Sequence, residues 1–178
     1  MIIALAGRRV DAADAKESRF PLQSVDIVRS RVREMLKAQG ATAVVSAAAC
    51  GADLVALSEA GRLELRRRVV LPFARGRFRE SSVTDRPGDW GRLYDQVLDE
   101  VEAAGDLIMM DRVSDNEAYS AANRAILDEA VRLGKELHAA VGAVLVWDGA
   151  SRGPDDLTEE FGTEARKRGL AVVEVKTL

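Results

Sequence analysis

The chain of 178 residues is 47% hydrophobic and 31% charged, a composition typical of a single soluble globular domain spanning residues 1–178. Its formal net charge of −3 argues against a dedicated nucleic-acid-binding protein. No apolar run approaches the ~20 residues that span a bilayer, and no basic segment precedes the apolar N-terminus, so we expect neither a membrane protein nor a signal peptide.

Apolar, β-like runs alternate with segments of helical periodicity. In chain order, the patterns predict a strand at 2–6, an irregular polar segment at 8–21, a helix at 24–39, a strand at 42–46, a helix at 52–62, a strand at 68–71 and a loop at 73–79. They continue with a helix that starts near Pro87 and reaches Val101, a strand at 107–110, a helix from Asn116 to between Leu133 and Ala140, a strand at 143–147, a helix at 156–168 and a strand at 172–175.

This alternation predicts an α/β fold with three layers, a Rossmann-like, mainly parallel sheet of about six strands flanked by helices. Ligands of open parallel sheets bind at the carboxyl ends of the strands. Glycine, arginine and aspartate residues follow several of the predicted strands, so the candidate site residues are sought there.

The first predicted strand ends at Gly7, Arg8 and Arg9, with Asp11 close behind. Glycine lets the backbone turn sharply and approach a ligand. Two guanidinium groups at a strand end can bind a phosphate or a carboxylate. The alternative interpretation is a solvated turn in a chain with many surface arginines.

A second candidate runs from Ser46 to Asp53 and includes Gly51 and Ala52. Small residues leave room for contacts between backbone and ligand, and the amides that open the following helix can hold an anion. The alternatives are that Asp53 only caps the helix and that the alanines serve close packing. Cys50 lacks the nearby histidine that a catalytic Cys–His pair requires. As the single cysteine, it cannot form an internal disulfide, which agrees with a cytoplasmic location.

A third candidate follows the strand at 143–147. Asp148 and Gly149 form a turn, and Arg152 and Gly153 lead to Asp156 at the predicted helix start. Acidic residues crowd this helix start and would repel an anion, so hydrogen bonds to sugar hydroxyls or to an amine suit the site better than a phosphate does. The alternative is that these acids only cap the helix.

Further side chains border the same predicted sheet edge. Tyr119 and Asn123 share a helix face, and Arg75, Phe78 and Arg79 follow the third strand. No His/Cys/Asp cluster has metal-ligand spacing, so we expect no metal site, and His138 is expected to be structural or exposed. The Walker A and Gly-x-Gly-x-x-Gly motifs are both missing, so the sequence assigns no cofactor.

Taken together and in order, these motifs resemble the SMF/Lonely-Guy (SLOG) superfamily of Rossmann-like proteins. The resemblance covers nearly the whole chain and lies in Gly7-Arg8-Arg9, Gly51-Ala52-Asp53, Val70-Leu71-Pro72-Phe73 and Val146-Trp147-Asp148-Gly149. It implies binding of a nucleotide or nucleotide-derived small molecule at the carboxyl edge of the sheet. Members of the superfamily include cytokinin-releasing phosphoribohydrolases, DNA-processing proteins and ligand-sensing domains.

The enzymatic branch carries the motif Pro-Gly-Gly-x-Gly-Thr-x-x-Glu. Gly162-Thr163 matches its centre, but Thr158, Glu159 and Glu160 replace Pro-Gly-Gly, and Arg166 replaces the final Glu. Leu157, Phe161 and Ala165 recur every four residues, which places Gly162-Thr163 inside a helix. A surviving phosphate loop would therefore lie at residues 149–154 instead.

The leading hypothesis is a cytoplasmic protein that binds a nucleotide-like ligand in a sensing or carrier role. Arg8 and Arg9 would hold anionic groups, the loops at Gly51 and Gly149 would offer backbone contacts, and Asp53, Asp148 and Asp156 would contact hydroxyls or the base. One alternative is a nucleotide N-glycosidase or phosphoribohydrolase, in which Asp53, Glu80 or Asp148 activates water. Another is an assembly module without a small-molecule site, and a homodimer is compatible with each.

Overall fold

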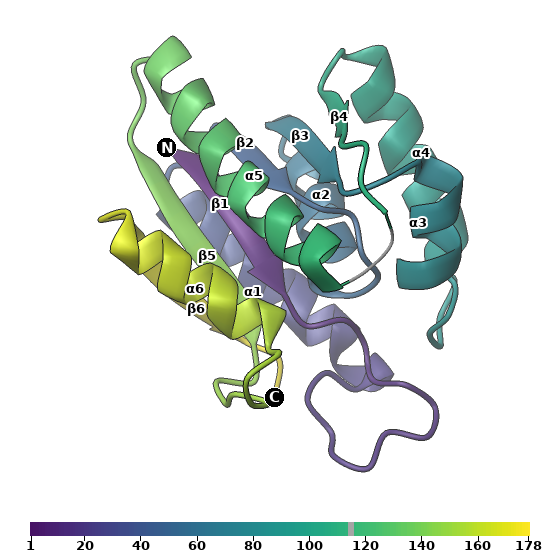
Figure 1. Ribbon diagram of the computed structural model, residues 1–178. Helices are drawn as coiled ribbons and strands as arrows, with labels where there is room; N and C mark the ends of the chain where they lie inside the picture. The colour runs from purple at the N-terminus through teal and green to yellow at the C-terminus, as the bar shows by residue number, and fades with distance from the viewer. Residues whose placement is uncertain (114–115) are drawn as a thin grey trace.

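The computed structural model describes residues 1–113 and 116–178. It forms one six-stranded sheet in the order β4-β3-β2-β1-β5-β6, and every pair of neighbouring strands is parallel (Figure 1). The strands are β1 (Ile2–Gly7), β2 (Ala43–Ser46), β3 (Arg66–Leu71), β4 (Leu107–Met109), β5 (Val141–Trp147) and β6 (Ala171–Lys176). The predicted parallel α/β fold is confirmed.

Helices cover both faces of the sheet. They are the short 3-10 helix η1 (Leu22–Ser24), followed by α1 (Val25–Ala38), α2 (Ala52–Arg62), α3 (Arg75–Ser82), α4 (Trp90–Ala103), α5 (Asn116–Glu136) and α6 (Leu157–Lys167). Helices α5 and α6 lie on the face turned to the viewer in Figure 1, and α1, α2 and α4 pack on the opposite face. Among the described residues, no helix is long and apolar enough to cross a membrane.

The position of β1 at the centre of the sheet explains why its sequence is apolar throughout. Successive side chains of a strand point to opposite faces. Ile3 and Leu5 join the core under α1, α2 and α4, whereas Ile2, Ala4 and Ala6 join the core under α5 and α6. Because both faces are covered, a continuous hydrophobic run is the expected pattern for a strand of a parallel sheet.

The predicted loop at 73–79 is wrong in part, because residues from Arg75 onward form helix α3. This helix buries only Phe78 and Ser82, so it lacks a continuous apolar stripe. Contacts with α4 hold it instead, and the Phe78 ring lies 6.3 Å from that of Tyr94. Arg79 pairs with Asp95 through two hydrogen bonds of 2.9 Å.

Smaller differences concern the ends of elements. Strand β3 starts at Arg66, two residues before the prediction, because Arg66 already pairs with Ala43 of β2. Arg66 and Arg68 both bind the buried carboxylate of Asp106. Pro87 lies before helix α4 rather than in its first turn, and its carbonyl accepts a 2.8 Å hydrogen bond from Trp90 Nε1.

The strand order positions the candidate site. From β1 the chain proceeds through β2 and β3 to β4 on one side, and then returns to place β5 and β6 on the other side. The order therefore reverses beside β1, and the carboxyl ends of strands at such a reversal border a crevice in open α/β sheets. The irregular segment at 8–21 leaves β1 at this edge (Figure 1).

Candidate functional site

A cavity of about 430 Å³ opens at the carboxyl ends of β1, β2 and β3. The end of β1 and the segment after it form one wall, and the turn from β2 into α2 forms another. Further lining comes from Phe78 and Ser82 of α3, Tyr119 and Asn123 of α5, and Thr158 of α6. Five segments that are far apart in sequence thus meet at the predicted edge of the sheet.

Small residues make the space in the cavity. Ala6, Ala47, Ala49 and Ala122 line it, and none of them has a side chain that could fill it. The aromatic ring of Tyr119 is held in place from two sides. Its ring lies edge-on to Phe73 with 5.8 Å between centroids, and its hydroxyl is 3.1 Å from Ser82 Oγ.

Three arginines that line the cavity have few partners in the protein. Arg9 pairs with Asp85 through Nη2, whereas its buried Nε has no hydrogen-bond partner among the described residues. Arg86 makes a long 3.4 Å hydrogen bond to Val10 O, and its Nε lies 3.6 Å from Asp85 Oδ2. Arg152 Nε lies 3.8 Å from Asp156, which is too far for a hydrogen bond.

Burial and neighbouring arginines both act on the Arg152 guanidinium. Burial lowers the pKa of the Arg152 guanidinium, and Arg8, Arg19 and Arg86 lower it further, so that the attraction of Asp156 is outweighed. A guanidinium in such surroundings favours an anion as its partner. The cavity wall near Arg152 thus carries several positively charged side chains, alongside the carboxylates of Asp11, Glu17 and Asp53.

Asp53 is the buried carboxylate on the cavity wall, with 8% of its surface exposed. It lies in the first turn of α2, but the residue at the N-cap is Gly51, so the alternative interpretation that Asp53 only caps this helix is wrong. Its Oδ2 accepts a 3.2 Å hydrogen bond from the Ala49 N–H. Burial raises the pKa of Asp53 to about 7, and contacts with Ala49, Ser46 and Arg9 only partly oppose this effect.

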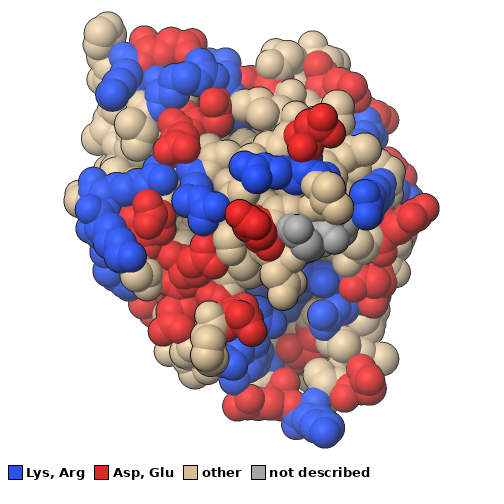
Figure 2. All heavy atoms as spheres, viewed as in Figure 1, with Lys and Arg blue, Asp and Glu red and all other residues tan. Residues whose placement is uncertain are grey.

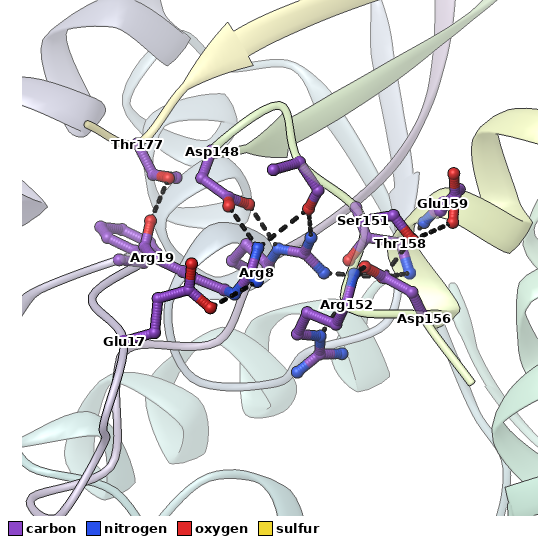
Figure 3. A network of polar contacts seen from close by, with 12 residues as sticks. Arg8, Glu17, Arg19, Asp148, Ser151, Arg152, Asp156, Thr158, Glu159 and Thr177 are labelled. Carbon is purple, nitrogen blue, oxygen red and sulfur yellow. Dashed lines mark hydrogen bonds and ion pairs between the residues drawn. The ribbon is translucent and has the colours of Figure 1, made fainter. Parts of the chain in front are cut away.

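Arg8 lines the cavity, but internal partners occupy its guanidinium (Figure 3). Its Nε donates to Asp148 Oδ1 at 2.8 Å, Nη1 donates to Asp156 Oδ1 at 2.6 Å and Nη2 donates to the Ala150 carbonyl at 2.6 Å. The group also lies 5.4 Å from the centre of the Trp147 ring. This arrangement does not fit the expected role of Arg8 in holding an anion, because the donors are already used inside the protein.

Asp148 and Asp156 belong to this same network and do not line the cavity. Asp156 is the N-cap of α6 and accepts hydrogen bonds from the Thr158 and Glu159 N–H groups at 3.0 and 3.2 Å. Burial raises its pKa, but the Arg8 hydrogen bond and the backbone donors outweigh burial and bring the pKa to about 2. The alternative interpretation of Asp156 as a helix cap is confirmed.

The predicted glycines and Ala52 have mainly structural surroundings. Gly7 lines the cavity, but a Cβ there would lie 2.4 Å from the Val146 carbonyl, so this position is closely packed. Gly51 has φ +96° and lies against the segment after β1, where a Cβ would be 2.7 Å from Arg8 O. Four of the predicted site residues do not line the cavity: Gly51, Ala52, Gly149 and Gly153.

The irregular segment at 8–21 forms a loop whose two ends are joined by hydrogen bonds. We call this joined region, made by Asp11, Arg19 and Phe20, the neck of the segment. The Asp11 N–H donates to the Phe20 carbonyl at 2.8 Å, and the Asp11 carboxylate accepts from the Arg19 and Phe20 N–H groups. Arg19 Nη1 then donates to Asp148 Oδ2 at 2.6 Å, so this neck joins the Arg8 network (Figure 3). Asp11 and Arg19 both line the cavity.

Sequence patterns identified part of this lining. Of the residues proposed for the sheet edge, Phe78, Tyr119 and Asn123 do line the cavity, whereas Arg75 and Arg79 pair with acids of α4 instead. Arg86 and Ser82 were missed. They lie beyond the third strand in segments without a recognisable motif, and only the folding of α3 brings them to the cavity.

The described residues contain no cluster of three His, Cys, Asp or Glu side chains that could hold a metal ion. Basic and acidic side chains are intermixed on the face drawn in Figure 2 rather than separated into patches. Neither a scan against protein-family models nor a search of curated proteins gives a match for this chain.

Proposed function

We propose that this protein binds a nucleotide or a nucleotide-derived small molecule in the cavity at the end of β1, as the resemblance to the SLOG superfamily implies. The observation that carries the proposal is the meeting of Arg9, Arg86 and Arg152 around an open cavity at the strand-order reversal. Its volume of about 430 Å³ falls in the range of small-molecule sites, roughly 300–1,000 Å³. An assembly module without such a site would not need this open crevice.

The two kinds of lining suit the two parts of such a ligand. Arg9, Arg86 and Arg152 line the cavity, and their guanidinium groups supply donors for a phosphate. The ring of Tyr119 supplies an apolar face for a base or a sugar. Asn123 donates one amide N–H to the Leu157 carbonyl at 2.9 Å, which leaves its Oδ1 and second N–H for the ligand. This assignment moves the anion contact from Arg8, whose donors are occupied, to the other arginines.

A thermal-shift screen tests the proposal. It compares nucleoside phosphates, cyclic nucleotides and nucleotide sugars with the matching nucleosides, which lack the phosphate. Free ligand at 100 times its Kd stabilises the folded state by ~2.7 kcal/mol. We expect a shift with a nucleotide that is lost or reduced in Arg86→Gln and Arg152→Gln.

Arg92→Gln is the matched control, because Arg92 is an exposed arginine on α4 outside the cavity. It should bind like the wild type. Absence of a shift with every nucleotide, or equal shifts in the wild type and both cavity variants, would contradict the proposed site.

One observation favours a second candidate function, hydrolysis of an N-glycosidic bond. Of the three carboxylates considered for activating water, Glu80 is exposed on α3 and Asp148 is bound by Arg8 and Arg19. Asp53 alone of the three lines the cavity, and its pKa of about 7 suits a general base near neutral pH. Water would attack C1′, Asp53 would accept a proton from the water, and the bonding electron pair would leave with the base.

Chromatographic detection of free base after incubation with nucleoside monophosphates separates the two functions. A hydrolase releases base in the wild type but not in Asp53→Asn, which should still bind the nucleotide. If the wild type binds the nucleotide but releases no base, the result excludes hydrolysis and supports the sensing or carrier function.

A further inference from the structure

Asp53 differs from the other buried carboxylates of this protein. Glu59 is paired with Arg33 at 2.6 Å, Asp106 with Arg68 at 2.7 Å and Asp156 with Arg8 at 2.6 Å. Asp53 is buried as well, yet it has no ion-pair partner in the described part of the chain. It is also the one of these four carboxylates that lines the cavity.

An ionised carboxylate that is buried without a counterion is costly, and it can relieve this cost by taking up a proton. The groups that oppose protonation of Asp53 are limited. They are the Ala49 N–H, the Ser46 hydroxyl and the positive charge of Arg9, which reaches the cavity from the end of β1.

The remaining charged or titratable groups around the cavity come from several elements. The thiol of Cys50 lies beside Arg9, and burial raises its pKa, so it stays neutral near pH 7. The hydroxyl of Tyr119 on α5 is hydrogen-bonded to the Ser82 hydroxyl. The other charged side chains on the wall are Arg8, Asp11, Glu17, Arg19, Arg86 and Arg152.

An anion bound by Arg9 would offset the positive charge that favours ionised Asp53 and would add a negative charge near it. Both changes favour the protonated carboxyl group. We propose that Asp53 takes up a proton when an anionic ligand binds in this cavity, and that it contacts the ligand as a neutral hydrogen-bond donor. The inference rests on the proposed binding function, because it requires an anion in the cavity. It excludes the hydrolytic alternative, in which Asp53 must be ionised while the nucleotide is bound.

The sign of the pH dependence follows from linkage. Asp53 has a pKa of about 7 without ligand, and the bound anion moves it higher. Affinity is then independent of pH well below 7, where Asp53 is protonated in both states. It falls by up to tenfold per pH unit above 7 until the pKa of the bound state is reached.

Calorimetric titration at about pH 8, in buffers that differ in ionisation enthalpy, counts the protons taken up on binding. Suitable probes are 3′,5′-cyclic AMP and inorganic sulfate, whose charges stay constant over this pH range, whereas a phosphate monoester itself titrates near pH ~6. We expect uptake of up to one proton by the wild type and none by Asp53→Asn. The asparagine variant should keep at pH 8 the affinity that the wild type has at about pH 6.

Glu34→Gln provides the control, because Glu34 is an exposed carboxylate on α1 outside the cavity, and it should take up protons as the wild type does. Anion binding without proton uptake overturns this inference and leaves the proposed function standing. Equal uptake by Asp53→Asn also overturns it. If neither probe binds at any pH between about 6 and 8, both this inference and the anion site of the proposed function fail.

Discussion

Arg8 and Asp156 are 148 positions apart in sequence, and a 2.6 Å hydrogen bond joins Arg8 Nη1 to Asp156 Oδ1 in the folded protein. Both side chains are almost fully buried, at 2% and 0% exposure. The pair ties the end of β1 to the start of α6, and Asp148 ties the same guanidinium to the neck of the segment at 8–21. Arg8 thus shapes the cavity wall, although its donors face the protein.

The first prediction concerns this pair. Removing one partner of a buried ion pair costs about 3–5 kcal/mol, because the other charge stays buried without compensation. For Arg8→Gln we expect a loss of free energy of unfolding at the lower end of this range. Asp156 keeps its hydrogen bonds from the Arg152, Thr158 and Glu159 N–H groups. At roughly 2–4 °C per kcal/mol, Tm should fall by about 6–12 °C in calorimetry. A change in Tm as small as that of Arg92→Gln would show that the pair contributes little.

The second prediction concerns acid. The pKa of Asp156 is about 2 in the folded protein, below the ordinary value of 3.8. A lowered pKa adds stability above pH ~4, and this stability is lost as the pH falls toward 2. The wild type should therefore lose on the order of 2 kcal/mol relative to Asp156→Asn between pH ~5 and ~2. Urea titrations at several pH values measure this difference, and a constant difference would contradict the assignment.

The third prediction concerns Asp53, whose effect on stability has the opposite dependence on pH. Its pKa is raised from 3.8 to about 7, so the folded state binds more protons than the unfolded state between these values. Stability then falls as the pH rises through this window. Asp53→Asn removes the penalty and should exceed the wild type in free energy of unfolding by on the order of 4 kcal/mol above pH ~7, with little difference below pH ~4. Glu34→Gln should show no such pH-dependent gain.

Much of the fold was predictable because its strands are buried on both faces. The runs at β1 and β5 are apolar over their full lengths, and the stripe of α1 is regular, so their positions follow from local pattern. Helix α3 buries only Phe78 and Ser82, and ion pairs with α4 support it. Such contacts between distant residues leave no periodic pattern within the segment itself.

The same distinction applies to the candidate site. Arg9 and Asp53 were predicted because a parallel sheet brings the ends of its strands to one edge, so residues after each strand meet. The sequence does not reveal that carboxylates of the protein occupy the Arg8 guanidinium, because these partners, Asp148 and Asp156, follow a strand near the far end of the chain. Charge type alone does not tell whether a buried arginine faces a ligand or a carboxylate of the protein.

The fourth prediction concerns Gly51, which lets the turn before α2 pack against the segment after β1. Its φ is +96°, and a Cβ would lie 2.7 Å from both Arg8 O and Val10 N. Backbone strain alone costs of order 1–3 kcal/mol for a residue other than glycine. Gly105 has a φ of +73°, but a Cβ at that position would meet no atom of the described residues within 4 Å, so Gly105→Ala serves as a control for alanine at a positive φ without a clash.

We expect Gly51→Ala to lower the free energy of unfolding by more than Gly105→Ala does, because the alanine must displace the backbone of residues 8–10 as well. That displacement also moves Arg9 and the cavity wall, so nucleotide affinity should fall in Gly51→Ala and stay unchanged in Gly105→Ala. Urea titration measures the first effect, and calorimetric titration measures the second. Equal destabilisation by the two variants would show that the loop yields to the added methyl group without cost.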